Sequence, residues 1–387
     1  MKSKMPYLII LFLFCANNAN KGDANMSMDI KPITIVAEKP ISKLASLSID
    51  NTFAAIVGGE FVEVKILKDE KLEITPIVPG FPNDGGDILY SDPANNVLWI
   101  TSSRGISVLD LATKKTSEKI LSGYGNDNLS PGSYLMAFDK KVIYVNIAHI
   151  DAAFGGSRPG SNFVLFDYLN NKVDFESKGY DGGMIAISKD KFLFAESEKD
   201  EQGNKYRKWK ITDKDFSKSE ENKLTMKLNE AKLKIEYVQS KSYDLEKRMM
   251  FGWKDLNNKR RDFVVRWKEG FEDVTIEPII IQGPEGYLFG QHFYFSPSGE
   301  WVKTSGFKDK GSGEEQIIFF HTSDKYPQSL SFGIVGGKTG DASRDNGAFV
   351  NHKEWGPLYV DRDEDNMNLL RVYKLNDALK AIQKGMK

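Results

Sequence analysis

Histidines are the first residues of this chain that could do chemistry, because imidazole nitrogens bind transition metals. The four are His149, His292, His321 and His352. On the strand boundaries predicted below, the first two fall toward one end of the strands and the last two at the opposite turns. At most a pair could meet, and two nitrogens without nearby carboxylates make a poor zinc or copper site. We therefore expect structural histidines and no metal centre.

Aspartates at alternate positions offer a second possible cation site. Asp361, Asp363 and Asp365 in VDRDEDNMN have the spacing of a calcium-binding loop. However, Asn366 stands where that loop needs glycine, and Val372 stands where it needs the closing bidentate carboxylate. The pattern therefore predicts the solvated tip of a hairpin.

Motifs for covalent or nucleotide chemistry are absent from the sequence. It contains no Gly-x-Ser-x-Gly elbow, no Walker loop, no dinucleotide fingerprint and no paired-cysteine metal motif. We expect no cofactor and no catalytic residue on these grounds.

The elements that must position any site are short strands in a recurring unit of about forty residues. Residues 85–120 show it most clearly, with the apolar runs DILYS, VLWITS, ISVLDL and TSEKI separated by turn-forming residues. Four short antiparallel strands per unit are typical of a propeller blade. The sequence therefore predicts an all-β fold.

Seven such units can be traced, which predicts a seven-bladed β-propeller of four-stranded antiparallel blades over residues 33–376. The units cover residues 41–77, 85–120, 132–177, 183–221, 232–280, 290–334 and 347–375. The last unit supplies only three strands, and residues 33–39 (ITIVAEK) are the candidate for the fourth. That pairing would close the ring and remove exposed sheet edges.

Two segments concern helices. Residues 222–239 are interpreted as a strand, a turn at Asn229 and Glu230, and a strand; the alternative is one amphipathic helix, since Leu224, Leu228 and Leu233 lie near helical spacing. Residues 377–387 are expected to form a short C-terminal helix with Asn376 as its N-cap.

Two stretches resemble known propeller families. SPSGEWVKTSGF at residues 296–307 resembles the strand, Ser-Pro-x-Gly turn and strand of WD-repeat-like and Tol-type propellers. NNVLWITSSRGISVLDLATKK at residues 95–115 is similar to the repeat of surface-layer YVTN propellers. The resemblance implies the propeller fold and no particular activity.

Long connections are predicted at one end of the blades. The turns between first and second strands, and between third and fourth strands, are short, whereas the other connections are long: residues 76–86, 122–132, 151–161, 197–208, 281–290 and 333–347. Long loops commonly bind ligands, and aromatic residues and arginine are common interface anchors. The expected ligand-binding residues are Phe81, Tyr124, Phe154, Arg158, Tyr287 and Arg344.

The N-terminus predicts export. Residues 1–15 place two lysines before an apolar run that is too short to span a bilayer, as in a signal peptide, and end at Cys15, the only cysteine. The segment resembles a bacterial lipoprotein signal, which implies lipidation of Cys15 and a location in the bacterial cell envelope. The alternative is ordinary cleavage at Ala19 or Ala24, leaving a periplasmic or secreted protein. Residues 16–32 are polar and are interpreted as a flexible tether.

Charge limits the partners. The 53 basic and 54 acidic side chains nearly cancel, so no overall field favours nucleic acid.

The sequence thus predicts a monomeric, non-enzymatic module, lipid-anchored to a membrane, that binds a protein, peptide or glycan. The alternative is a small propeller enzyme, a lyase or hydrolase, with His149, His292 and either Asp84 or Asp127 at the channel mouth.

Overall fold

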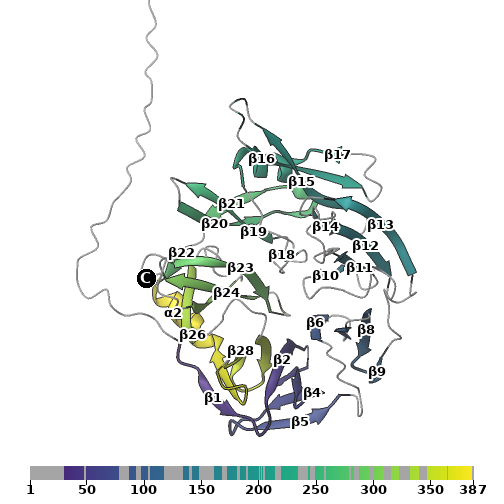
Figure 1. The fold of residues 1–387 in the computed structure, drawn as a ribbon. Coiled ribbons are helices and arrows are strands. Elements are labelled where there is room, and N and C mark those ends of the chain that lie inside the picture. Colours follow the sequence, from purple (N-terminus) through teal and green to yellow (C-terminus); the bar gives the residue numbers. More distant parts are fainter. Residues whose placement is uncertain are drawn as a thin grey trace, which may run out of the picture.

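Antiparallel hairpins make up nearly all of the described structure. A computed structural model describes residues 30–47, 49–77, 87–92, 97–102, 105–116, 134–138, 142–147, 161–167, 172–180, 184–188, 191–199, 201, 203, 205–213, 219–233, 243–244, 249–256, 259–278, 280–282, 287–296, 298, 300–308, 315–321, 332–339, 347–363 and 365–385. Within these residues the strands form seven sheets, which follow one another in chain order around a common centre (Figure 1). This is the arrangement of a β-propeller, as the sequence predicts.

The first three sheets each contain four strands that are adjacent in sequence. They are formed by β2 (Ile41–Ser46), β3 (Thr52–Val57), β4 (Glu60–Ile66) and β5 (Leu72–Pro76); by β6 (Asp87–Asp92), β7 (Val97–Ser102), β8 (Gly105–Asp110) and β9 (Lys115–Thr116); and by β10 (Tyr134–Phe138), β11 (Val142–Ile147), β12 (Ser161–Asp167) and β13 (Lys172–Tyr180). Strand β2 contacts β6, and β6 contacts β10, so the first strands of neighbouring sheets lie next to one another.

The next two sheets have the same order. They contain β14 (Met184–Ser188), β15 (Lys191–Lys199), β16 (Lys205–Asp213) and β17 (Ser219–Glu220), then β18 (Tyr243–Asp244), β19 (Met249–Leu256), β20 (Lys259–Arg266) and β21 (Thr275–Pro278). A short 3-10 helix, η1 (Glu269–Phe271), lies between β20 and β21.

The sixth sheet has five strands, where the sequence predicted four. It contains β23 (Tyr287–Phe295), β24 (Trp301–Lys308), β25 (Glu315–His321) and β26 (Phe332–Thr339), and β22 (Ile280–Gln282) pairs with β26 in parallel. The sequence predicts a single strand over TIEPIII, residues 275–281, as the last strand of the preceding unit. The run is instead divided between two sheets, with β21 pairing with β20 and β22 pairing with β26.

The seventh sheet joins the two ends of the propeller. Its strands are β27 (Gly347–His352), β28 (Gly356–Arg362) and β29 (Leu369–Lys374), and β1 (Ile33–Val36) pairs antiparallel with β29. Asn368 also donates a 3.1 Å hydrogen bond from its side chain to the carbonyl of Ala37. The predicted closure by residues 33–39 is thus observed.

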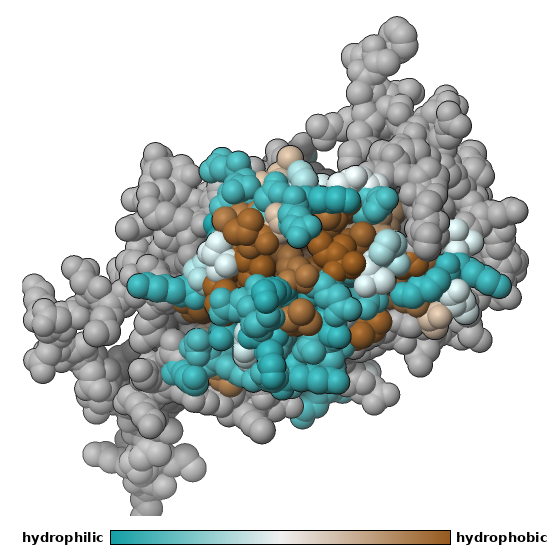
Figure 2. All heavy atoms as spheres, turned by 90° about the horizontal axis from the view of Figure 1, so that it is seen from below, coloured by the Kyte–Doolittle hydropathy of each residue, from teal (hydrophilic) through white to brown (hydrophobic). Residues whose placement is uncertain are grey.

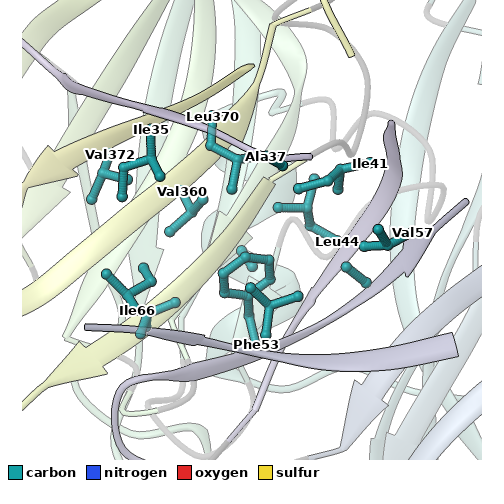
Figure 3. Packing of buried hydrophobic residues seen from close by; sticks show 14 of the residues in the cluster. Ile35, Ala37, Ile41, Leu44, Phe53, Val57, Ile66, Val360, Leu370 and Val372 are labelled. Atoms are coloured by element: carbon teal, nitrogen blue, oxygen red, sulfur yellow. The ribbon is translucent and has the colours of Figure 1, made fainter. Parts of the chain in front are cut away.

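Apolar side chains of β27–β29 and β1 pack against the first sheet. Figure 3 shows Ile35, Val360, Leu370 and Val372 facing Phe53 across this interface, all with 3 % exposure or less. Arg362 adds a 3.2 Å hydrogen bond to the carbonyl of Ser42 on β2. The first and last sheets therefore adhere through an almost entirely aliphatic core.

The interpretation of residues 222–239 as a strand, turn and strand is wrong at its start, because α1 (Lys223–Glu230) is a helix. Asn222 accepts a 3.0 Å hydrogen bond from the Thr225 amide, and the Thr225 hydroxyl accepts one from the Asn222 amide, which forms a capping box. Leu224 and Leu228 are fully buried against the core that contains Trp209. Residues 234–239 lie outside the described residues.

The predicted C-terminal helix is α2 (Leu375–Gly385). It begins at Leu375, so Asn376 lies within the helix rather than at its N-cap, and the Asn376 side chain donates a 3.3 Å hydrogen bond to the Trp355 carbonyl. Leu375 and Ala378 are fully buried, and the helix packs against β26 and β28 (Figure 1).

Not all apolar side chains are buried. Seen from below, hydrophobic side chains gather between bands of hydrophilic ones (Figure 2). On the closing strand β1, Val36 is 70 % exposed, whereas its neighbour Ile35 is 3 % exposed. The two residues therefore form a matched pair for measuring what the closing strand contributes.

We expect Ile35→Ala to lower the free energy of unfolding by about 2–4 kcal/mol, because it leaves a cavity in a packed core. Val36→Ala should change it by less than about 0.5 kcal/mol. Urea denaturation followed by tryptophan fluorescence measures both. An effect of Ile35→Ala as small as that expected for Val36→Ala would show that β1 contributes no packing energy to ring closure.

Candidate functional site

The two faces of the seventh sheet differ in chemistry. Alternation along β28 directs Leu358 and Val360 toward the first sheet, and Tyr359 and Asp361 toward the sixth. On the sixth sheet Trp301, Ile317 and Phe319 pack in the same cluster as Tyr359, Phe349 and Tyr373. The interface between the sixth and seventh sheets is therefore aromatic, and it also contains buried charges.

Lys303 on β24 supplies the first of these charges. It is only 2 % exposed. Its Nζ lies 5.0 Å from the centre of the Tyr294 ring and 5.8 Å from that of the Tyr359 ring. Tyr294 belongs to the sixth sheet and Tyr359 to the seventh, so the ammonium bridges the two sheets through the negative faces of aromatic rings.

Asp361 on β28 supplies the opposite charge and is 8 % exposed. Burial raises the pKa of this carboxyl to about 6, although the positive charges of Lys303 and Arg371 act in the other direction. Arg371 lies directly opposite Asp361 on β29. A buried carboxyl that titrates near neutrality can hold or release a proton under physiological conditions.

Arg371, which lies opposite the buried Asp361, also pairs with a carboxylate that is closer to solvent. Its guanidinium forms a 3.2 Å ion pair with Asp363, with side-chain exposures of 12 % and 24 %. Asp363 also accepts 3.0 Å hydrogen bonds from the amides of Asp365 and Asn366, which fixes the turn after β28. The charges thus run from the interior to the edge of the sheet.

Tyr373 and Tyr359 complete the cluster. Burial raises the pKa of the Tyr373 hydroxyl well above its ordinary value, with the negative charge of Asp361 adding to the effect. Tyr359 contacts Phe319 at 5.4 Å and Phe349 at 5.0 Å between ring centres. A Cβ on Gly347 would collide with the Tyr359 hydroxyl, so the backbone at the start of β27 packs directly on this tyrosine.

We call this cluster the charged seam: Tyr294, Lys303, Tyr359, Asp361, Arg371 and Tyr373. Sequence reasoning missed five of these residues and misjudged Asp361. The expected solvated tip is confirmed only in part, because Asp365 is exposed whereas Asp361 is buried. One signal in the sequence could have identified Lys303, because it lies inside the predicted strand WVKTSGF. A strand with both faces covered has no exposed position for a charge.

The predicted ligand-binding residues lie mostly beyond the part of the chain that the structure describes. These are Phe81, Tyr124, Phe154, Arg158 and Arg344, together with Cys15. Tyr287 was expected in a loop, but it is the first residue of β23 and pairs with Lys308 on β24. The structure therefore brings none of these residues together among those it describes.

Some predicted long loops are partly strand. Within residues 197–208, Ser197 pairs with Arg207 and Lys199 with Lys205, so the hairpin of β15 and β16 extends further than predicted. Strand β26 covers residues 332–339 and so includes the start of the predicted loop 333–347. In the first case, ion pairs between Lys208 and Glu198 and between Lys210 and Glu196 join β15 and β16, so a polar run forms part of a hairpin.

Several long connections still leave from one end of the sheets. Residues 77–86, 117–133, 148–160 and 221–242 each join a second to a third strand, or an outer strand to the first strand of the next sheet. In a sheet of alternating strands these connections share one end, which we call the loop-rich end. Connections 267–274, between β20 and β21, and 322–331, between β25 and β26, are longer connections at the opposite end.

The two histidines whose side chains are described are structural. His321 ends β25 and packs edge-on against Trp301, with 4.7 Å between ring centres. His352 stacks on Trp355, and its Nδ1 accepts a 3.1 Å hydrogen bond from the Trp355 amide. Burial lowers the pKa of both imidazoles. His149 and the side chain of His292 lie outside the description.

The described part of the chain contains neither a metal-binding cluster of side chains nor a membrane-spanning helix. No group of three or more His, Cys, Asp or Glu side chains there could hold a metal ion. Among the same residues, no helix has the length and apolar character needed to cross a membrane.

Comparison with known proteins gives remote structural similarity only. No protein-family model matches the sequence, and no curated protein matches it. The β-propeller domain of the trilobed protease from Pyrococcus furiosus is 12 % identical, with a TM-score of 0.46, covering 87 % of this chain and 94 % of that one. Oligogalacturonate lyase from Vibrio parahaemolyticus is 9 % identical, with a TM-score of 0.49, covering 89 % and 96 %. The strand order itself shows the propeller arrangement.

We expect the contributions of the two buried charges, Lys303 and Asp361, to the free energy of unfolding to depend strongly on each other. Lys303→Met should lower the free energy of unfolding at pH 7.5 by about 3 kcal/mol, because it leaves the Asp361 carboxylate with fewer partners. Lys303→Met combined with Asp361→Leu should cost at least about 1 kcal/mol less than the sum of the single substitutions.

Urea denaturation of the wild type, both single variants and the double variant measures this coupling. Arg371 keeps Asp363 as a partner in every variant, so the double variant leaves no new unpaired arginine. Strictly additive effects would mean that Lys303 and Asp361 do not interact across the two sheets.

Proposed function

We propose that this chain is an exported, lipid-anchored, seven-bladed propeller that binds a protein, peptide or glycan at its loop-rich end. In this proposal each of the seven sheets is one blade. The observation that carries it is the strand order, which directs connections 77–86, 117–133, 148–160 and 221–242 to one end of the sheets. Loops that exceed the length of a turn and share one end of a rigid scaffold commonly form a binding surface.

The charge distribution fits this class of partner better than nucleic acid. The whole chain has a formal net charge of -1, and described surface charges are commonly paired, as in Lys210 with Glu196 at 2.6 Å and Lys208 with Glu198 at 3.5 Å. A nearly neutral surface of paired charges does not concentrate phosphate backbones. Contacts from aromatic side chains and arginine would then supply the affinity.

The proposed anchor is a lipid on Cys15. The segment before it has the basic start and apolar core of an export signal. A single acyl chain binds membranes only weakly, whereas a multiply acylated cysteine anchors stably. The polar residues 16–32 would separate the anchor from β1, which begins at Ile33.

A second candidate function is a small propeller enzyme, a lyase or hydrolase. It would require His149 and His292 to meet a carboxylate, Asp84 or Asp127, at the end of the central channel. The described histidines His321 and His352 are held in aromatic contacts, which leaves the general acid-base role to the other two.

Replacing Tyr124, Phe154 and Arg158 together with alanine should abolish capture of the partner in a pull-down from membranes, with an unchanged melting temperature. The matched control is alanine at Ile49, Lys68 and Lys71, which lie in the short turns at the opposite end of the first sheet. Capture that survives the first substitution, or that is lost equally in the control, would remove the loop-rich end from consideration.

Cys15→Ser should abolish metabolic labelling by a palmitate analogue and shift the protein from the membrane to the soluble fraction. The physical reason is that the proposed lipid is the sole source of membrane affinity in this proposal. Labelling of wild type and variant, measured in the same cells, gives the comparison. Labelling that persists in the variant would refute the anchor without affecting the proposal about loop binding.

A further inference from the structure

The interface between the sixth and seventh sheets contains a proton-binding group that ring closure does not require. The interface between the seventh and first sheets is filled with apolar side chains such as Val360, Leu358 and Phe53. Replacing buried charges by apolar residues is often neutral or stabilising. Charges retained in the sixth–seventh interface therefore suggest a role other than adhesion.

The charged groups around Asp361 come from three strands. Lys303 on β24, Arg371 on β29 and the neighbouring Arg362 on β28 lower its affinity for a proton, while burial raises it. Tyr373 on β29 and Asp363 after β28 complete the surrounding titratable groups. Protonation of Asp361 removes its negative charge, whereas the Lys303 ammonium keeps its contacts with the Tyr294 and Tyr359 rings.

A series of contacts connects Asp361 to the loop-rich end. The Lys303 ammonium lies over the Tyr359 ring, and the Tyr359 hydroxyl packs on Gly347. Gly347 pairs directly with Asp361 and is the first residue of β27. Charge at Asp361 therefore bears on the residue where the chain enters the sheet from the proposed binding surface.

We propose that the charged seam is a proton-dependent switch, which holds the sixth and seventh sheets more firmly together in mildly acidic solution than at neutral pH. This inference goes beyond the proposed binding function, since it concerns the packing of the two sheets whatever the loops bind.

The direction follows from proton linkage. The Asp361 carboxyl has a pKa of about 6 in the folded protein, above the value of about 3.9 for an aspartate in an unfolded chain. The folded state therefore binds more protons between these values. The stabilising contribution is complete below about pH 4 and is lost as the pH rises through about 6, where the carboxylate forms in a buried site.

The test is the pH dependence of unfolding between pH 4 and pH 8 for the wild type and for Asp361→Asn. The folding equilibrium constant of the wild type, divided by that of the variant, should fall by up to about 100-fold from pH 4 to pH 7.5. Taking the ratio cancels the opposite contribution of His321 and His352, whose buried imidazoles favour higher pH. Amide hydrogen exchange of residues 301–305 and 347–361, corrected for intrinsic rates, should show the same profile.

Two further variants separate a switch from a merely structural pair. Lys303→Met should move the midpoint of the profile above pH 6, because the lysine charge favours the carboxylate. Asp363→Asn, which removes a carboxylate bound to the same Arg371 at the sheet edge, should leave the midpoint in place. A flat ratio between wild type and Asp361→Asn, or a midpoint that Lys303→Met does not move, would overturn the proposal.

Discussion

The pairing of β1 with β29 is the constraint on which the rest of this structure depends. It brings residues separated by more than 300 positions into one sheet, as in the hydrogen bond from Asn368 to Ala37. Because that sheet is completed from both ends of the chain, its two faces must meet the first and the sixth sheets simultaneously. Closing such a long loop costs entropy, which only extensive packing can offset. The aliphatic cluster around Phe53 and Val360 supplies that packing.

The repeat made the strands predictable, and the reason is physical. Short apolar runs bounded by turn residues indicate strands in a sheet whose two faces are both covered. The errors fall where local signals compete. Asn222 and Thr225 form a capping box that only a helix can use, although the residues after it resemble a strand. In residues 275–282, Pro278 separates two segments that contain isoleucine, and the assignment of the second to β22 depends on the edge of β26, which is distant in sequence.

The candidate site was harder to predict than the fold. Asp361, Asp363 and Asp365 alternate, so the sequence predicts one common environment for all three. The structure separates them because β28 ends at Arg362, leaving Asp361 under the aromatic cluster and Asp365 exposed. Lys303 is similar, since its burial depends on Tyr294 and on Tyr359 in the neighbouring sheet. Such contacts between sheets have no signature in a single repeat.

The two interfaces of the seventh sheet show how one strand can serve two purposes. Alternation along β28 lets Val360 stabilise closure on one face while Asp361 titrates on the other, so substitutions on either face act on different properties. A buried carboxyl with a pKa of about 6 loses its proton at neutral pH, which makes the folded protein less stable there than in mildly acidic solution. The ring tolerates this cost because closure rests on the opposite face. The aliphatic interface is therefore what permits a titrating group to persist in the aromatic one.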